Sequence, residues 1–464
     1  MRKSLIGVLA IPLLIVIAIG IYFIPPIHER LSIHVDEAVG QIKYYINPPD
    51  QAVFQPQQSQ QDATQQGAIK AIVSATMQAF DAAQAHAAAQ TPTAATPLSA
   101  ANEATPTPTS TLAPLPATVN LPGVVYMDQT GGWNLCGPTN LYMALKFWGW
   151  TGDRDNIIKV VKPGENDPTK SFFERGFTDH NVMPYELVDF VNNDTKFRAL
   201  YRYGGDIQLV KTMVAAGFPV VAEKGYYEAD YTGKIGWLGH YQFITGYDDG
   251  AQQLIVQDTW KDGPNFHIAY SAFMNGWRAF DYIFYVVYPP DRENDVMKLL
   301  GSYSDPKWAA QNALDTDNKD IPSLTGIDLF FGWFAKGTSD VALQQYTDAA
   351  NAYDQAFSIY NSLGSDNSER PYRMMWYQSG PYFAYYYSAR YQDVIDLANT
   401  TLNKTIAQPT LEESLYWRGM AEQALGDTTD AIADFKKANY LNPKMAAIIQ
   451  VLQSLGITPV KPIE

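Results

Sequence analysis

Four residue types in the middle of the chain could together carry out acyl transfer. Cys136 is the only cysteine among the 464 residues, and it precedes a Gly-Pro-Thr run where a helix is expected to begin. The unpaired amides and the dipole of a helix N-terminus favour a thiolate over a thiol. Gln129 lies upstream, where its side-chain amide could donate to an oxyanion beside the Cys136 amide. A lone cysteine is more often packing than chemistry, so its neighbours decide its character.

A histidine and an aspartate are expected on two neighbouring strands. His240 opens a strand after the glycine-rich loop GKIGWLGHY, and Asp258 ends the next strand in QLIVQDTW. A tight turn around Asp249 joins these strands, so we expect His240 and Asp258 to be near cross-strand partners. A carboxylate beside an imidazole fixes its tautomer and supports a thiolate–imidazolium pair. Cysteine, histidine, aspartate and glutamine are then a chemically complete set.

Other candidates in this part of the chain have ordinary structural explanations. His180 and His267 are expected to bond locally or to face solvent. Glu223 follows a short strand and could face a cleft, although a solvated charge at a strand end is the usual case. Trp133 and Trp237 could line a substrate groove or belong to the core.

The elements that must position these residues indicate an α+β domain. Helices are predicted from about Cys136 to Trp148, over Tyr185–Asn192 and over Asp206–Ala216, and a strand is predicted over Phe218–Ala222. Three further strands follow, in HYQFITGYDDG, QQLIVQDTW and DYIFYVVYPP, with turn residues between them.

The segments QTGGWNLCGPTNLYMALKFWG, GHYQFITGYDD and IVQDTW resemble the papain-like fold of cysteine peptidase family thirty-nine, which holds the double-glycine leader peptidases and their stand-alone exported relatives. The resemblance covers residues 121–290. It implies Cys136 as nucleophile, His240 as general base, Asp258 as the residue that orients the base, and Gln129 in the oxyanion hole. Leader peptidases of this family are fused to an ATP-binding cassette transporter, whereas this chain has no GxxxxGK[ST] nucleotide loop. We therefore expect an extracytoplasmic peptide as substrate.

The N-terminus carries an expected membrane anchor. Arg2 and Lys3 precede an apolar run over residues 5–24, about twenty residues that at about 1.5 Å each span a bilayer core. No small-residue cleavage site follows, so we interpret residues 1–27 as a transmembrane signal anchor, with a cleaved export signal as the alternative. Both interpretations place the bulk of the chain outside the cytoplasm, and the anchor interpretation makes it a single-pass protein of the cell membrane.

Two segments are expected between the anchor and the α+β domain. Residues 28–90 are predicted to form a helical stalk region, and residues 91–120 a Thr/Pro-rich linker that cannot bury a core. Repeated prolines make this linker a semi-rigid spacer that would hold the following domain away from the membrane.

Residues 291–464 are predicted to be helical throughout. Residues 412–445 fit the tetratricopeptide pattern, with Gly419 at a small position and Phe435 at the aromatic position. An earlier copy follows Trp333, with Gly337 and Tyr353 in the same relative positions, and a weaker copy lies between them. We expect these repeats to bind a protein partner or the substrate. The aromatic run MMWYQSGPYFAYYY could be a peptide-binding face, although packing between helices is the favoured explanation of such a run.

Composition excludes several classes of function. The formal net charge is −15, from 33 basic and 48 acidic side chains, and no basic stripe is present, which argues against nucleic-acid binding. One cysteine excludes an intramolecular disulfide and a multi-cysteine zinc site, and the sequence predicts no metal and no other cofactor. The predicted fold class is an α+β papain-like cysteine peptidase domain followed by an all-α tetratricopeptide-like helical repeat domain, after an N-terminal transmembrane helix.

The functional hypothesis is a membrane-anchored extracytoplasmic cysteine peptidase that hydrolyses peptide bonds through a Cys-His-Asp triad and a glutamine oxyanion hole. Two alternatives stay open. The papain-like domain could be a catalytically silent binding module on a cell-surface scaffold, or it could transfer the acyl group to an amine as an amide ligase.

Overall fold

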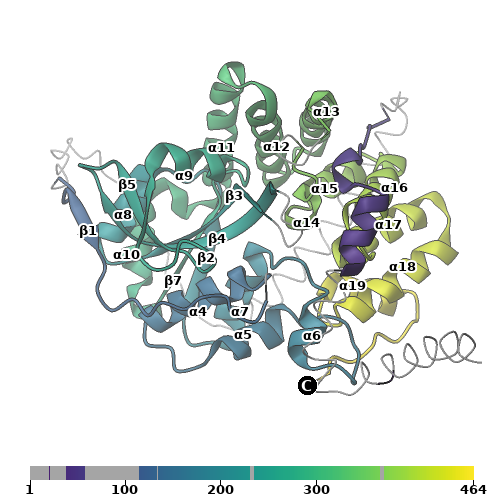
Figure 1. Ribbon diagram of the computed structural model, residues 1–464, viewed down its shortest axis with the longest axis horizontal. Helices are drawn as coiled ribbons and strands as arrows, with labels where there is room; N and C mark the ends of the chain where they lie inside the picture. The colour runs from purple at the N-terminus through teal and green to yellow at the C-terminus, as the bar shows by residue number, and fades with distance from the viewer. Residues whose placement is uncertain are drawn as a thin grey trace, which may run out of the picture.

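The computed structural model describes residues 20, 38–57, 114–132, 134–229, 235–365 and 370–463. The predicted membrane span lies outside these residues except for Gly20, and most of the predicted linker and Trp133 also lie outside them. Within the described ranges, no helix is both long and apolar enough to span a bilayer. The described chain forms a domain built on a sheet and, beside it, a helical region (Figure 1).

An antiparallel sheet lies at the centre of the first domain. Its strands follow the order β2-β7-β3-β4-β5-β6, and β1 pairs with the end of β4. Their bounds are β1 Thr118–Asn120, β2 Arg198–Arg202, β3 Val220–Ala229, β4 Ile235–Asp248, β5 Gln253–Gln257, β6 Phe266–Ala269 and β7 Phe284–Tyr288. The sheet thus begins inside the range expected to be linker, because residues 118–120 pair with β4 as a strand.

Helices cover both faces of this sheet (Figure 1). On one face α4 (Cys136–Phe147), α5 (Arg154–Val161) and α7 (Pro184–Asp194) pack against alternate strand residues such as Val221 and Tyr285. On the other face α8 (Ile207–Ala215), α9 (Tyr270–Arg278) and α10 (Glu293–Leu300) pack against Val220 and Phe284. Side chains alternate between the faces of a strand, so a strand buried on both faces is apolar along its length. The predicted α+β architecture is confirmed.

The boundary of this domain lies beyond the expected position at residue 290. Val296 and Leu300 of α10 are buried in the same core as the sheet. We call residues 118–300 the sheet domain. A short helix, α6 (Phe172–Gly176), lies in the loop between α5 and α7, on the side that faces the helical region.

The helical region, residues 306–454, contains no strand among its described residues. Its helices are α11 Pro306–Asp320, α12 Gly326–Ala342, α13 Tyr346–Ser362, α14 Met374–Tyr377, α15 Gly380–Tyr387, α16 Tyr391–Thr400, a π-helical turn Thr401–Thr405, α17 Glu412–Leu425, α18 Thr428–Leu441 and α19 Ala446–Ser454. Short 3₁₀ turns lie at Pro49–Gln51, Pro290–Arg292, Gly301–Ser304 and Ile321–Ser323.

Two helix hairpins of this region repeat one close contact. A Cβ atom on Gly337 of α12 would lie 2.7 Å from the ring of Tyr353 in α13. A Cβ atom on Gly419 of α17 would lie 2.8 Å from the ring of Phe435 in α18. In both hairpins the missing side chain lets an aromatic ring approach the first helix. These are the small and aromatic positions of the predicted repeat.

Residues 38–57, which we call the N-terminal segment, pack against the helical region (purple in Figure 1). The Phe54 ring is buried and lies 4.9 Å from the ring of Phe357, and Asn361 donates a hydrogen bond of 3.2 Å to the Phe54 carbonyl oxygen. Lys43 Nζ donates to the carbonyl oxygen of Ala407 at 2.7 Å. This part of the expected stalk therefore belongs to the globular body.

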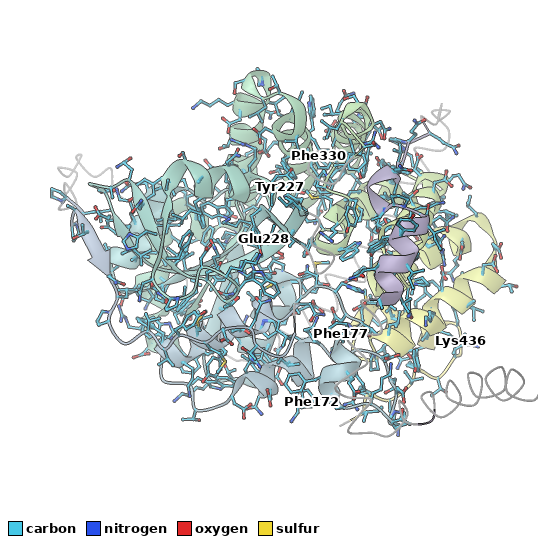
Figure 2. All side chains as sticks on the ribbon, in the orientation of Figure 1. Phe172, Phe177, Tyr227, Glu228, Phe330 and Lys436 are labelled. Carbon is cyan, nitrogen blue, oxygen red and sulfur yellow. The ribbon has the colours of Figure 1, made fainter. Side chains whose placement is uncertain are left out.

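The sheet domain and the helical region share a packed boundary. Trp237 of β4 is buried there, with its ring 5.7 Å from that of Tyr377 in α14. Asn166 N–H donates to the Tyr440 carbonyl oxygen at 2.7 Å. Side chains of both parts fill this boundary, and Phe177 lies there on the side of the sheet domain (Figure 2). Of the two explanations for Trp237, the structure supports core packing.

Candidate active site

Cys136 lies at the first turn of α4, and 9% of its surface is exposed. Its sulfur accepts hydrogen bonds from the backbone amides of Gly137 and Tyr241 and is hydrogen-bonded to the His240 side chain. Burial raises the pKa of the Cys136 thiol, but these hydrogen bonds and the charge of His240 outweigh burial, so the pKa is lowered. The geometry favours a thiolate.

His240 is held between this sulfur and a carboxylate. Its Nε2 atom lies 3.1 Å from Oδ2 of Asp258, which leaves Nδ1 for the sulfur of Cys136. Burial lowers the pKa of His240, but Asp258 and Cys136 together raise it to about 9. Burial raises the pKa of the Asp258 carboxyl, but the neighbouring His240 outweighs burial and holds that pKa well below its usual range. A thiolate–imidazolium pair is therefore favoured near neutral pH.

Asp258 is fixed by three hydrogen bonds besides the contact with His240. Gln242 Nε2 donates to its Oδ2 at 2.7 Å, and the amides of Trp260 and Lys261 donate to its Oδ1 at 2.8 and 3.1 Å. Its carboxylate therefore cannot rotate freely, and the imidazole it contacts is oriented with it.

His240 and Asp258 are brought together, but not directly opposite each other. Phe243 pairs with Gln257, and the register shifts between Ile244 and Gly246. This irregularity places Gln242 instead of Phe243 opposite Asp258, so His240, two residues along β4 on the same face, reaches the carboxylate diagonally. The expected cross-strand contact is formed, displaced along β4.

Gln129 and Cys136 both line the wall of the same cavity. Its backbone N–H donates to the Thr259 carbonyl oxygen at 2.9 Å, and Thr259 Oγ1 donates to its side-chain oxygen at 2.8 Å. Because Thr259 engages the amide oxygen, the orientation of the Gln129 amide group is defined. The other atom of the amide group, Nε2 of Gln129, is the hydrogen-bond donor.

Asn140 joins the helix of the cysteine to the strand of the histidine, and sequence reasoning missed it. It is fully buried, and its Nδ2 donates to the carbonyl oxygens of Cys136 at 2.9 Å and Tyr241 at 3.0 Å. The available signal was a polar residue one turn after Cys136 on a helix that is otherwise buried among apolar side chains.

We expect Asn140→Leu to remove the side-chain donor from two buried carbonyl oxygens, which destabilises the fold by about 1–3 kcal/mol. It should also slow alkylation of Cys136 near neutral pH severalfold, because Asn140 no longer joins the helix of Cys136 to the strand of His240 by hydrogen bonds. Asn192→Leu is the matched control, because Asn192 makes two hydrogen bonds to the Ala199 backbone away from the site. Denaturant unfolding should show both variants destabilised. Equal alkylation pH profiles for both variants would show that Asn140 is merely structural.

Of the other predicted candidates, Glu223 lies near the pair and His267 lies apart from it. Glu223 is buried in β3 opposite Tyr241 and is not a solvated charge. Burial, and next the charge of Cys136, raise its pKa well above the usual range. His267 is hydrogen-bonded locally, with its Nδ1 3.1 Å from the side-chain oxygen of Gln253.

The expectation that His180 bonds locally or faces solvent was wrong. Its Nε2 lies 3.1 Å from Oγ1 of Thr410 in the helical region. Burial, together with the charges of Lys162 and Arg373, lowers its pKa to about 3, so the ring is neutral. Sequence reasoning could not find this contact, since its two residues are far apart in the chain.

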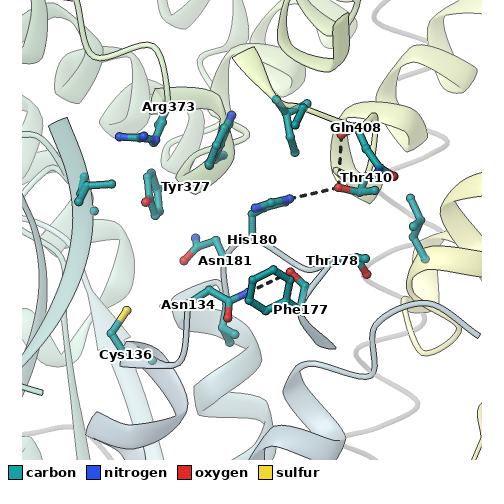
Figure 3. A pocket seen from close by; sticks show the side chains of 18 of the residues that line it. Asn134, Cys136, Phe177, Thr178, His180, Asn181, Arg373, Tyr377, Gln408 and Thr410 are labelled. Carbon is teal, nitrogen blue, oxygen red and sulfur yellow. Dashed lines mark hydrogen bonds between the residues drawn. The ribbon is translucent and has the colours of Figure 1, made fainter. Parts of the chain in front are cut away.

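A cavity of about 380 Å³ opens between the two parts of the molecule, and Cys136 and His240 lie in its wall. Figure 3 shows Cys136 at one side and Gln408 and Thr410, from the helical region, at the other. Within the described part of the chain, no group of three His, Cys, Asp or Glu side chains could hold a metal ion.

A helix that begins at a cysteine and packs on an antiparallel sheet whose strand carries the paired histidine defines a papain-like cysteine peptidase domain. Residues 120–283 match the model of the Peptidase_C39 like family. This part of the chain is therefore similar to the C39-like peptidases.

Two solved structures are each similar to somewhat more than a third of the chain. A C39-like peptidase from Bacillus anthracis is 18% identical, with 37% of this chain and 96% of that chain covered and a TM-score of 0.29. The peptidase domain of Streptococcus ComA, a bi-functional ABC transporter involved in a quorum sensing pathway, is 14% identical, with 36% and 98% covered and a TM-score of 0.26.

One curated relative is RNA polymerase-associated protein CTR9 of Saccharomyces cerevisiae, which is 27% identical over 134 residues. The alignment covers 28% of this chain and 12% of the length of that relative.

Proposed function

We propose that the sheet domain is an active cysteine peptidase that hydrolyses peptide bonds. The observation that carries this proposal is the contact of His240 with both Cys136 and Asp258, which lowers the pKa of the thiol and raises that of the imidazole. A catalytically silent binding module has no physical need for a buried pair of this kind.

In the first half of the reaction the Cys136 thiolate attacks the substrate carbonyl carbon. The oxyanion that forms accepts hydrogen bonds from the Cys136 backbone N–H and the Gln129 side-chain amide. Imidazolium His240 gives its proton to the leaving amine, and the carbon–nitrogen bond breaks to leave a thioester on Cys136.

In the second half the neutral His240 takes a proton from water, and the resulting hydroxide attacks the thioester carbonyl. The carbon–sulfur bond breaks, the acid product leaves, and the thiolate returns beside an imidazolium. Asp258 holds the ring in one orientation and stabilises its charge in both halves.

The location of this activity rests on the sequence. We propose that residues 1–27 anchor the chain and that the peptidase acts outside the cytoplasm on a peptide or protein, with the helical region contributing to recognition. The apolar run over residues 5–24 supports the anchor.

The proposed activity predicts that Cys136 of the full-length chain reacts with iodoacetamide near neutral pH much faster than free cysteine does, because the thiolate is the reacting species. Cys136 is the only cysteine, so a single mass addition reports its rate. A peptide-library digest should show cleavage that Cys136→Ala abolishes. An ordinary thiol rate and equal digests for both chains would contradict the proposal.

A further inference from the structure

The cavity at Cys136 is walled partly by residues outside the sheet domain. The helical region contributes Trp376 and Tyr377 of α14 and Ile406, and the N-terminal segment contributes Val39 and Tyr44. In Figure 3, Tyr377 lies between Arg373 and Cys136. The cavity that reaches the sulfur is therefore formed jointly by the sheet domain, the helical region and the N-terminal segment.

The walls of this cavity are largely apolar. The sheet domain contributes Phe177, Tyr226 and Trp260, which add to Trp376 and Tyr377 from the helical region. An apolar cavity with a few oriented polar groups is the usual form of a ligand site.

Two of the polar groups in the wall are hydrogen-bonded to other protein atoms. Asn134 Nδ2 donates to the carbonyl oxygen of Asp179 at 2.5 Å, and the neutral His180 is hydrogen-bonded to Thr410. These groups do not require a charged ligand to satisfy them, which favours an apolar ligand group.

Tyr44 is held in the wall by the helical region. Lys43 Nζ donates to the Ala407 carbonyl oxygen at 2.7 Å, and Tyr44 Oη donates to the Thr405 carbonyl oxygen at 3.3 Å. These carbonyl groups lie at and just after the end of the π-helical turn, where a helix leaves acceptors without partners. The next residue, Tyr45, is 90% exposed and lies outside the cavity wall.

We propose that this cavity binds a large apolar side chain of the peptide substrate, next to the carbonyl that Cys136 attacks, and that the helical region with the N-terminal segment selects it. The inference rests on the proposed peptidase function, because it places the side chain beside an attacked carbonyl. Burial of an aromatic side chain in such a cavity corresponds to about a 10- to 100-fold preference over glycine.

The test compares two affinity labels on the full-length chain, the chloromethyl ketones of N-acetylphenylalanine and N-acetylglycine. In each, the Cys136 sulfur forms a bond to the methylene carbon and chloride leaves with the bonding electrons. We expect the phenylalanine label to react about 10-fold faster or more. Tyr44→Ala should reduce this preference, and Tyr45→Ala should leave it unchanged.

A filling variant gives a second measurement. Ala407 lines the cavity, and Ala407→Trp should slow the phenylalanine label more than the glycine label. Equal rates for the two labels, with fast iodoacetamide, would overturn the inference and leave the peptidase proposal standing. A label preference that Tyr44→Ala and Ala407→Trp both leave unchanged would overturn the role of the helical region. Slow iodoacetamide in the wild type would instead refute the peptidase proposal.

Discussion

Replacing His240 with alanine should reduce peptide hydrolysis by about 10²- to 10⁴-fold and return alkylation of Cys136 to the rate of an ordinary thiol. Burial raises the pKa of the Cys136 thiol, and the hydrogen bond and charge of His240 are the first causes that oppose it. Without His240, burial acts with less opposition, and the leaving amine also loses its proton donor. Steady-state hydrolysis and the iodoacetamide rate measure these two losses separately.

The pH profile of alkylation gives the sharper distinction. In the wild type the thiolate–imidazolium pair forms above the lowered pKa of Cys136, and it is lost as the pH rises through about 9, where His240 loses its proton. A neutral-pH plateau is therefore expected in the wild type. In His240→Ala the rate should rise only at alkaline pH. His267→Ala, at an exposed histidine with a local hydrogen bond, is the control and should keep the plateau. A plateau retained in His240→Ala would contradict the assignment.

Asp258→Asn should also cost about 10²- to 10⁴-fold in hydrolysis, for a different reason. Burial lowers the pKa of His240, and Asp258 is the largest opposing cause. Removing the carboxylate charge lets burial prevail, so His240 becomes neutral near pH 7 and Cys136 loses its cation. An asparagine oxygen can still accept from the Trp260 and Lys261 amides, so the loop should keep its shape.

The measurement for Asp258→Asn is the alkylation pH profile together with the thermal unfolding midpoint. We expect the neutral plateau to vanish while the fold remains. Gln242→Ala is the matched comparison, because it removes one hydrogen bond to Asp258 and leaves the charge in place. Its effect on hydrolysis should be several-fold only. A wild-type profile in Asp258→Asn would mean that the carboxylate does not support the imidazolium.

The aromatic run MMWYQSGPYFAYYY packs between helices and also lines the cavity of Cys136. Trp376, Tyr377, Tyr382 and Tyr385 are all buried, as packing between helices requires. Trp376 and Tyr377 also line the cavity of Cys136. The helical region is thus a wall of the candidate active site as well as a stack of helix hairpins.

The sequence alone determined the local elements of the site. The start of α4 at Cys136 and the hairpin that brings His240 near Asp258 follow from apolar periodicity and turn residues, which act over a few residues. The repeat positions Gly337 and Gly419 could also be predicted, because the repeat pattern places small residues there. In the structure each lies against an aromatic ring of the adjacent helix.

Only the tertiary structure decided the contacts between distant segments. Two features of the site depend on how strands and helices pack together. One is the register shift in β4 that puts Gln242 opposite Asp258, and the other is the hydrogen bond from Asn140 to the Tyr241 carbonyl oxygen. His180 contacts Thr410, and residues 38–57 pack on the helical region. Both contacts join segments that are far apart in the chain. Local propensity carries no information about such pairs, because their free energy comes from burial and hydrogen bonds that form only when the segments meet.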